Sequence, residues 1–231
     1  MNSYMLQFYR SFIVIFFILF YGLQSNAQYN YGAYNYYTLG VKGGYDVYDY
    51  SFDESRQMYH IVQPNFNFGI SGGYYLTYLL ELHADFRYSI RNFDLRWDFP
   101  EDPLGEVPAF SEYKLSYISV PIQLRINAIY ARWVKVNVGA GLMPDFRLRP
   151  YETVIYQNGN TNVSKHSYLT NNFTGVLVAI PLSVNLKINF SRHIAIEFSA
   201  NYYYYLNKMH KDFMTKAGKA YGFNAGFFYD W

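Results

Sequence analysis

The chain has 231 residues, a formal net charge of +2 and no cysteine. A charge this close to zero argues against nucleic acid as a partner, and the lack of cysteine excludes disulfides and thiolate metal sites. The 28 Tyr and 20 Phe residues bring the aromatic content to 22%, which suits a surface at a membrane interface.

The first 27 residues have the pattern of a secretory signal peptide. Arg10 precedes a continuously apolar run over residues 12–20, and Ser25-Asn26-Ala27 places small residues at positions −3 and −1 of a cleavage site. The run is too short to span a bilayer comfortably. We predict a signal peptide over residues 1–27, a periplasmic N-terminal segment over 28–37 and a barrel domain over 38–231. An uncleaved anchor helix is the alternative.

From residue 38 onward, apolar and polar residues alternate in eight segments. Residues 80–91 show this most clearly, because every even position is apolar and every odd position is polar. A strand sends successive side chains to opposite faces, so each segment has one apolar and one polar face. The predicted strands cover residues 38–47, 66–75, 80–93, 115–127, 134–148, 174–190, 194–206 and 221–231.

The connections between these strands alternate in length. Short turns fall near residues 76–79, 129–132 and 191–193, and long connections cover 48–63, 94–113, 150–173 and 207–220. Bacterial outer membrane barrels have short periplasmic turns and longer extracellular loops. We therefore predict an all-β fold, an eight-stranded antiparallel transmembrane up-and-down β-barrel. Asn158-Gly159 favours a hairpin within the longest connection, and a ten-stranded barrel is the alternative if that hairpin enters the wall.

The last predicted strand favours lipid, rather than water, around the barrel. Phe223, Phe227, Tyr229 and Trp231 project from one face of this strand, and the chain ends on an aromatic residue. This pattern resembles the recognition signal for outer membrane barrel assembly. Together with the signal peptide and the loop rhythm, it predicts a bacterial outer membrane location. The expected partners are outer membrane lipid, lipopolysaccharide and the barrel-assembly machinery; a soluble, Tyr-rich secreted sandwich is the alternative.

The polar faces are then predicted to line the lumen of the barrel. An eight-stranded barrel has an interior just wide enough for side chains to fill. Isolated charges there are costly, so we expect ion pairs and a plugged interior rather than a diffusion pore. The predicted lumen charge network consists of Lys42, Asp46, Glu81, His83, Asp85, Arg87, Arg91, Arg125, Lys135, Asp145, Arg147, Lys187 and Glu197.

No catalytic constellation is evident, and we expect no catalytic residue, no metal site and no cofactor. His83 and Asp85 are two residues apart on one strand, a spacing that allows acid–base chemistry but favours a lumen hydrogen-bond network. A lipid-modifying enzyme is an alternative, and its candidate side chains in the outer loops are His60, Ser164, His166 and Ser167.

Two of the long connections carry charge of one sign. The connection over residues 94–113 is acidic and contains three prolines, but it lacks the spacing of an EF-hand, so we expect a stiff, solvated loop. The last connection is basic and could contact lipopolysaccharide phosphates or an acidic partner. Its cations are Lys208, Lys211, Lys216 and Lys219.

Three stretches carry a family resemblance. They are Ser25-Asn26-Ala27-Gln28, Tyr117-Ile118-Ser119-Val120-Pro121-Ile122-Gln123-Leu124-Arg125 and Gly226-Phe227-Phe228-Tyr229-Asp230-Trp231. With them the mature chain resembles the PorT-like outer membrane β-barrel proteins of Bacteroidetes, within the small OmpA-type barrels. The resemblance implies an eight-stranded barrel, and a named member of the family is linked to type IX secretion. No functional residue is carried over from it.

The expected function follows from the plugged lumen. We expect a non-enzymatic envelope scaffold, or an accessory subunit of an outer membrane complex that resembles type IX secretion machinery and includes a further envelope protein. A narrow channel for small or apolar solutes and a lipid-modifying outer membrane enzyme are the alternatives.

Overall fold

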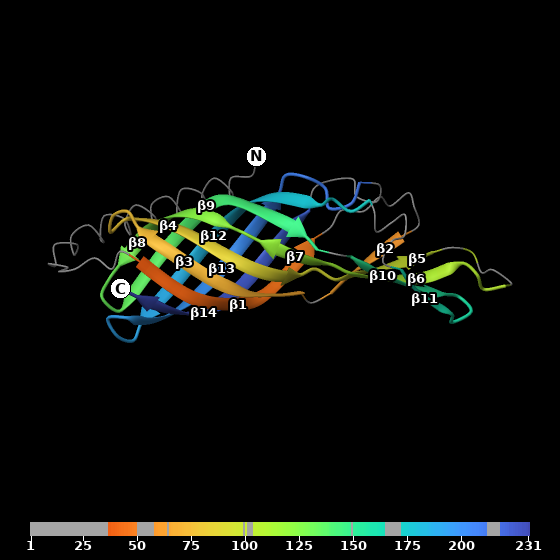
Figure 1. The fold of residues 1–231 in the computed structure, drawn as a ribbon, viewed down its shortest axis with the longest axis horizontal. Helices are drawn as coiled ribbons and strands as arrows, with labels where there is room; N and C mark the ends of the chain where they lie inside the picture. The colour runs from red at the N-terminus through yellow and green to blue at the C-terminus, as the bar shows by residue number, and fades with distance from the viewer. Residues whose placement is uncertain are drawn as a thin grey trace, which may run out of the picture.

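The computed structural model is a closed antiparallel β-barrel with a second sheet extending from one end (Figure 1). The structure describes residues 37–49, 58–63, 65–98, 100, 104–148, 150–164, 172–211 and 218–231. The predicted signal peptide and residues 28–36 lie outside the described residues. Within the described ranges, no helix is long and apolar enough to cross a bilayer.

The eight predicted strands form the barrel wall, so the predicted fold class is confirmed. Each wall strand pairs antiparallel with its neighbours, and the last strand pairs with the first over Thr38↔Asp230 to Asp49↔Lys219, which closes the barrel. The wall consists of β1 (Tyr37–Asp49), β3 (Asn65–Tyr75), β4 (Leu80–Ile90), β7 (Ser116–Ser119) continued by β8 (Ile122–Tyr130), β9 (Val134–Arg147), β12 (Val176–Asn189), β13 (Ile194–Tyr205) and β14 (Lys219–Asp230).

Proline interrupts one wall strand without opening the wall. Pro121 has no N–H to donate to a neighbouring strand, and it separates β7 from β8. The carbonyl of Pro121 still accepts a hydrogen bond from Asp85 N (3.0 Å), and Val120 N donates to the carbonyl of Pro144 (3.0 Å). Because β4 and β9 each pair with both halves, the two pieces act as a single wall strand.

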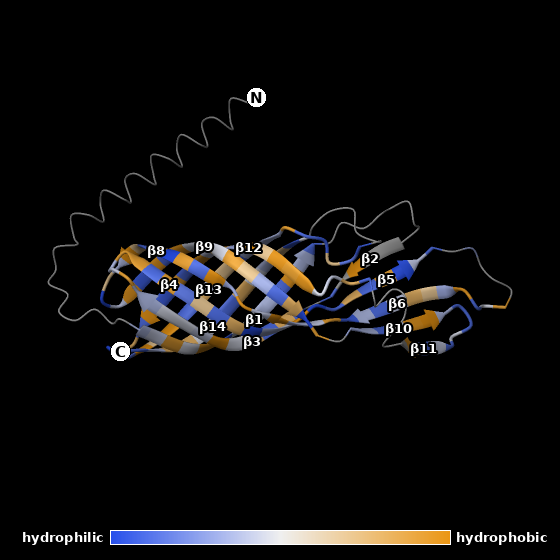
Figure 2. Ribbon diagram, turned by 45° about the horizontal axis from the view of Figure 1, so that its top comes forward, coloured by the Kyte–Doolittle hydropathy of each residue, from blue (hydrophilic) through white to orange (hydrophobic). Residues whose placement is uncertain are grey.

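The alternation of the sequence divides the wall into two faces. Figure 2 shows apolar and polar residues alternating along the barrel strands. On β14, for example, Phe223, Ala225, Phe227 and Tyr229 are exposed, and the residues that alternate with them are buried. The exposed aliphatic and aromatic side chains form the outer surface of the barrel, as expected for a wall in contact with lipid.

The long connections contain more regular structure than we predict. Five strands form a second sheet beyond the barrel, in the order β11-β10-β6-β5-β2 (Figure 1). These strands are β2 (Met58–Val62), β5 (Phe93–Trp97), β6 (Pro108–Lys114), β10 (Tyr151–Tyr156) and β11 (Thr161–Ser164). They continue the hairpins of the barrel, and their side chains Phe93, Leu95 and Tyr113 are buried. The prediction of a solvated acidic loop over residues 94–113 is therefore wrong for β5 and β6.

The Asn-Gly pair lies in this outer sheet. It connects β10 to β11, and Gly159 has a φ of 83°, a left-handed conformation that favours glycine. The other neighbour of β10 is β6, so the hairpin does not enter the barrel wall. The ten-stranded alternative is wrong for this reason.

Candidate functional site: the side-chain-filled lumen

The lumen is the most polar buried region that the structure describes. Of the predicted lumen charges, all are buried except Arg147, which is partly exposed at the outer end of β9. One buried lumen charge, Asp230, is absent from the predicted set. The alternation along β14 could have found it, because Asp230 lies between the exposed residues Tyr229 and Trp231.

These buried charges balance. Six basic side chains face six carboxylates, before His83 is counted, within the part of the barrel that the structure describes. The basic residues are Lys42, Arg87, Arg91, Arg125, Lys135 and Lys187, and the carboxylates belong to Asp46, Glu81, Asp85, Asp145, Glu197 and Asp230. When these opposite charges pair within the lumen, their attraction offsets the high free-energy cost of burying each charge.

At the end of the barrel where β1 begins and β14 ends, two lysines share one carboxylate. Lys187 Nζ donates to Asp230 Oδ1 (2.5 Å) and to Thr38 Oγ1 (3.0 Å). Lys135 Nζ lies 3.7 Å from the other oxygen of Asp230 and 4.7 Å from the centroid of the Tyr75 ring. The carboxylate on β14 thus contacts lysines from β12 and β9, so it ties the closing strand to two other wall strands.

Glu197 organises the centre of the lumen. Its Oε1 accepts a hydrogen bond from Lys42 Nζ (2.9 Å) and another from Ser199 Oγ (3.2 Å). Its Oε2 lies 3.2 Å from Arg125 Nη1, and the same guanidinium nitrogen lies 3.8 Å from Glu81 Oε1. Lys42, Arg125 and Glu197 come from β1, β8 and β13, so this cluster crosses the barrel interior.

His83 is held between two carboxylates. Its Nδ1 lies 2.8 Å from Glu81 Oε1, and its Nε2 lies 2.9 Å from Asp85 Oδ1. Each ring nitrogen therefore faces an acceptor. Asp85 also lies 3.9 Å from Arg87 Nε, and Arg87 Nη1 donates to the Tyr203 hydroxyl (3.0 Å). The hydrogen bonds of His83 run to carboxylates within the lumen, which is the arrangement of a structural network rather than of a substrate site.

The outermost lumen charge is enclosed by aromatic rings. The guanidinium carbon of Arg91 lies 4.2, 5.0 and 5.3 Å from the ring centroids of Tyr117, Tyr48 and Tyr205. Its Nη2 donates to Asp145 Oδ2 at 2.5 Å. Arginine over aromatic faces is stabilised by the ring quadrupole in addition to its ion pair. Arg91 therefore connects the charged lumen to the tyrosine rings at the outer end of the barrel.

An apolar cluster covers this outer end of the lumen. The rings of Phe93 and Tyr113 stack at 4.9 Å, and Phe173 packs edge-on against Tyr113 at 5.6 Å. The buried members of the cluster are Tyr48, Phe93, Leu95, Tyr113, Leu115, Tyr117, Met143, Phe173, Leu177, Ala179, Tyr203, Tyr205, Met209 and Ala220. The cluster contains side chains from the outer sheet and from the adjoining outer end of the barrel, so the outer sheet helps to close the lumen.

Buried polar groups of the outer sheet have perturbed acidity. The Tyr113 hydroxyl donates to Glu152 Oε1 (2.7 Å), and burial together with this carboxylate raises the pKa of Tyr113 well above its ordinary value. Burial also raises the pKa of Asp94, and Glu112 on the neighbouring strand adds to the increase, although the Gln63 amide donates to Asp94. The carboxylates of Asp94 and Glu152 and the phenol of Tyr113 are therefore buried parts of the folded outer sheet.

Inward glycines make room for the large lumen side chains. A Cβ on Gly44 would lie 2.0 Å from Asn224 Oδ1 and 2.2 Å from the carbonyl oxygen of Phe223. The same relation repeats along the closing pair of strands, where four large inward residues are each opposite a glycine. The pairs are Gly40↔Phe228, Lys42↔Gly226, Gly44↔Asn224 and Asp46↔Gly222. A shift of register would place large residues against each other, so this pattern specifies how the barrel closes.

The residues of the predicted assembly signal are exposed on the outer wall. Phe223, Phe227, Tyr229 and Trp231 are each more than half exposed. Trp231 packs against Tyr229 at 5.8 Å and against Tyr37 on the first strand at 6.1 Å, between ring centroids. The aromatic end of β14 therefore covers the junction of the first and last strands.

The side chains of His60, Ser164, His166 and Ser167 lie outside the described part of the structure. Over the residues that are described, no group of three or more His, Cys, Asp or Glu side chains could hold a metal ion. Lys208, Lys211 and Lys219 are exposed near the outer end of the barrel, and Lys216 lies outside the described residues.

A family model described as an outer membrane protein β-barrel domain matches residues 24–211. No curated protein sequence matches the chain. Among solved structures, Ail, the attachment invasion locus protein of Yersinia pestis, in complex with the heparin analogue sucrose octasulfate, is 13% identical, with a TM-score of 0.46 and coverage of 85% of this chain and 99% of that one.

Two further solved structures are similar at the same level. Neisserial surface protein A is 14% identical, with a TM-score of 0.45 and coverage of 87% of this chain and 99% of that one. OprG of Pseudomonas aeruginosa is 9% identical, with a TM-score of 0.46 and coverage of 84% and 95%.

Proposed function

Because this chain belongs to the family of outer membrane protein β-barrel domains, we propose that it is a non-enzymatic barrel that serves as an envelope scaffold or as an accessory subunit of an outer membrane complex. The chain lies in the outer membrane, and its wall presents an apolar surface to lipid. The observation that carries the proposal is the filled lumen, in which balanced buried charges are held by ion pairs and hydrogen bonds beneath an apolar cluster. A barrel filled in this way offers its outer wall and its outer sheet for contacts.

Single-channel recording tests the filled lumen directly. The refolded full-length mature protein, inserted in planar bilayers, is expected to give no stable open current. The matched comparison is a variant in which the Glu197 cluster is weakened by Lys42→Ala and Arg125→Ala. A steady current from the unchanged protein would refute the plugged lumen and assign the barrel to the narrow channels.

The outer sheet supports a role in protein contacts. It extends the barrel beyond the membrane-facing wall (Figure 1). Its side chains Phe93 and Tyr113 pack on Phe173 within the apolar cluster. A projecting sheet of this kind offers a surface to a partner protein in a secretion complex, such as one for type IX secretion. Crosslinking in native membranes, followed by identification of the captured proteins, is expected to yield an envelope protein joined to β2, β5, β6, β10 or β11. Recovery of the barrel with no protein attached to these strands contradicts the accessory role.

The exposed lysines support contact with anionic lipid. Lys208, Lys211 and Lys219 could pair with lipopolysaccharide phosphates at the outer end of the barrel. Replacing all three by Gln should weaken retention of lipopolysaccharide on the purified barrel, and equal retention contradicts this contact. In the same strains, the mass spectrum of lipid A should not depend on the protein; a protein-dependent change of mass instead favours the lipid-modifying enzyme.

A further inference from the structure

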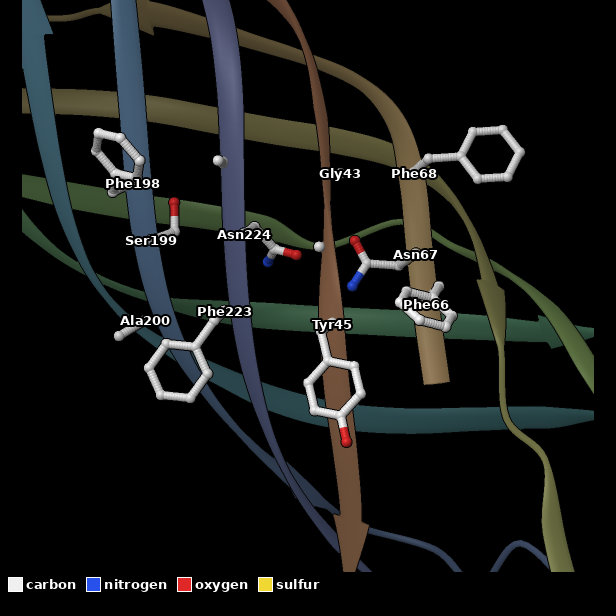
Figure 3. Close-up of a pocket in the computed structure, with 12 residues that line it drawn as sticks. Gly43, Tyr45, Phe66, Asn67, Phe68, Phe198, Ser199, Ala200, Phe223 and Asn224 are labelled. Atoms are coloured by element: carbon white, nitrogen blue, oxygen red, sulfur yellow. The ribbon is translucent and has the colours of Figure 1, made fainter. Parts of the chain in front are cut away.

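The lipid-facing wall has a hollow across the junction of the first and last strands. Two adjoining recesses of about 780 and 590 Å³ share Gly43, Phe68 and Ala225 in their linings. Figure 3 shows the larger recess, with Phe198 on one side of Gly43 and Phe66 and Phe68 on the other. Gly43 pairs with Ala225 on β14 and with Phe68 on β3. The hollow is therefore a row of small residues surrounded by phenyl rings.

The glycine at the base of the hollow is not required by the packing of the chain. A Cβ on Gly43 would meet nothing closer than Asn67 O at 3.4 Å, an ordinary van der Waals contact, whereas a Cβ on the inward Gly44 would clash at 2.0 Å. Gly43 is also not among the glycines with positive φ. Its missing side chain leaves an open space on the outer wall and relieves no strain.

The hollow lies at the middle of the apolar band. On β14, Ala225 is four residues from Tyr221 and four from Tyr229, the aromatic residues at the two ends of the lipid-facing row. Eight residues of strand span about 26 Å along the strand, and a tilt of about 35–45° reduces this to about 18–21 Å along the membrane normal, within the apolar band of about 25 Å. The recess is continuous with the lipid-facing surface above and below it, so at this depth the surrounding medium is acyl chains.

We propose that this recess is a binding site for one acyl chain of an outer membrane lipid. The chain lies over Gly43 and Ala225, and its methylene groups contact Phe68, Phe198 and Phe223. A methylene chain is narrow enough to fill a groove that a side chain leaves open, and the rings add contact area that a smooth aliphatic wall lacks. The proposal rests on the membrane location and is independent of whether the lumen conducts or the barrel has a protein partner.

Photolabelling from within the bilayer tests the site. The full mature protein is refolded into phosphatidylcholine vesicles that contain a small fraction of phosphatidylcholine with a diazirine at the middle of one acyl chain. After irradiation, peptide mass mapping compares the recess with Val138 and Val184, which pair with each other at mid-height on the opposite wall. The expected result is labelling of Phe68, Phe198 or Phe223 at least threefold above that of the two valines.

Two variants make the comparison specific. Gly43→Leu fills the recess and should lower its labelling at least threefold. Gly72→Leu changes another glycine of the barrel wall that has room for a Cβ, outside both recesses, and should leave the labelling unchanged. Heat-modifiable migration shows that each variant is folded, and the wild-type comparison with the valines stands if either variant fails to fold.

Two outcomes overturn the proposal. The first is equal labelling of the recess and of the opposite wall in the wild-type protein, or labelling that Gly43→Leu does not lower. The second is a covalent dimer that chemical crosslinking detects in the wild-type protein and that Gly43→Leu abolishes, because this result assigns the recess to a second copy of the chain.

Discussion

Replacing Glu197 by Gln should test the lumen network most directly. The substitution keeps the size of the side chain but removes the charge that faces Lys42 Nζ at 2.9 Å and Arg125 Nη1 at 3.2 Å. All three side chains are buried, so neither cation can recover its lost partner from bulk water. Arg125 keeps a weaker contact with Glu81 at 3.8 Å. Lys42 loses its direct ion pair with Glu197.

The expected loss is large because the charges are enclosed. Removal of one partner of a buried ion pair costs about 3–5 kcal/mol, since it leaves an uncompensated charge in the interior. We expect the free energy of unfolding of Glu197→Gln to fall within this range. A loss of about 3 kcal/mol already lowers the folding equilibrium constant more than a hundredfold, because each 1.4 kcal/mol is a factor of about ten.

Reversible unfolding by guanidinium chloride in phospholipid vesicles, followed by the fluorescence of the three Trp residues, measures this loss. The matched control is the double variant Lys42→Met with Glu197→Gln, which removes both members of the closest pair and leaves Arg125 with Glu81. The double variant should be at least about 1 kcal/mol more stable than Glu197→Gln alone, because a buried unpaired ammonium is worse than an apolar side chain. A loss below about 1 kcal/mol in the single variant, or equal losses in both, would contradict a dry, paired lumen.

Three further predictions concern packing and acidity. Gly44→Ala forces a Cβ against Asn224 and should lower the free energy of unfolding by about 1–3 kcal/mol. Gly43→Ala, at the adjacent outward position, should change it by less than about 0.5 kcal/mol. Equal effects of the two variants in denaturant titrations contradict the inward clash. Because the folded state raises the pKa of Tyr113, the outer sheet should lose stability as pH rises above about 10, and hydrogen exchange should show that Tyr113→Phe removes this slope. Leu95→Ala, at a completely buried position, should cost about 2–5 kcal/mol and speed proteolysis of the outer sheet before that of the barrel; protection equal to wild type counts against the apolar cluster.

The closed eight-stranded barrel could be predicted because its main signal is local. The side-chain period of a strand is two residues, so the segment over 80–91 shows its two faces in the sequence alone. The turns near 76–79 and 191–193 are short enough to require antiparallel neighbours. These features determined the fold class and the polar face of each strand without knowledge of any long-range contact.

The outer sheet was missed because its strands are short and its pattern is mixed. In β5, Phe93, Asp94 and Leu95 are consecutive buried residues, so the alternation that marks the barrel strands is absent. Prolines and carboxylates between β5 and β6 are typical of a solvated loop. Asp94 accepts a hydrogen bond from Gln63 and lies on a strand between β2 and β6, and no local pattern reports these contacts.

By itself the sequence determined that Glu197, Lys42 and Arg125 belong to polar strand faces, because alternation is a property of consecutive residues. Only the tertiary structure decided that Glu197 pairs with Lys42, which is 155 residues away, and that Asp230 joins two lysines. Pairing inside a barrel depends on the register of strands that meet on closure, and this register is fixed where large side chains lie opposite glycines on neighbouring strands. The faces are therefore local information, and the partners arise only when the sheet closes on itself.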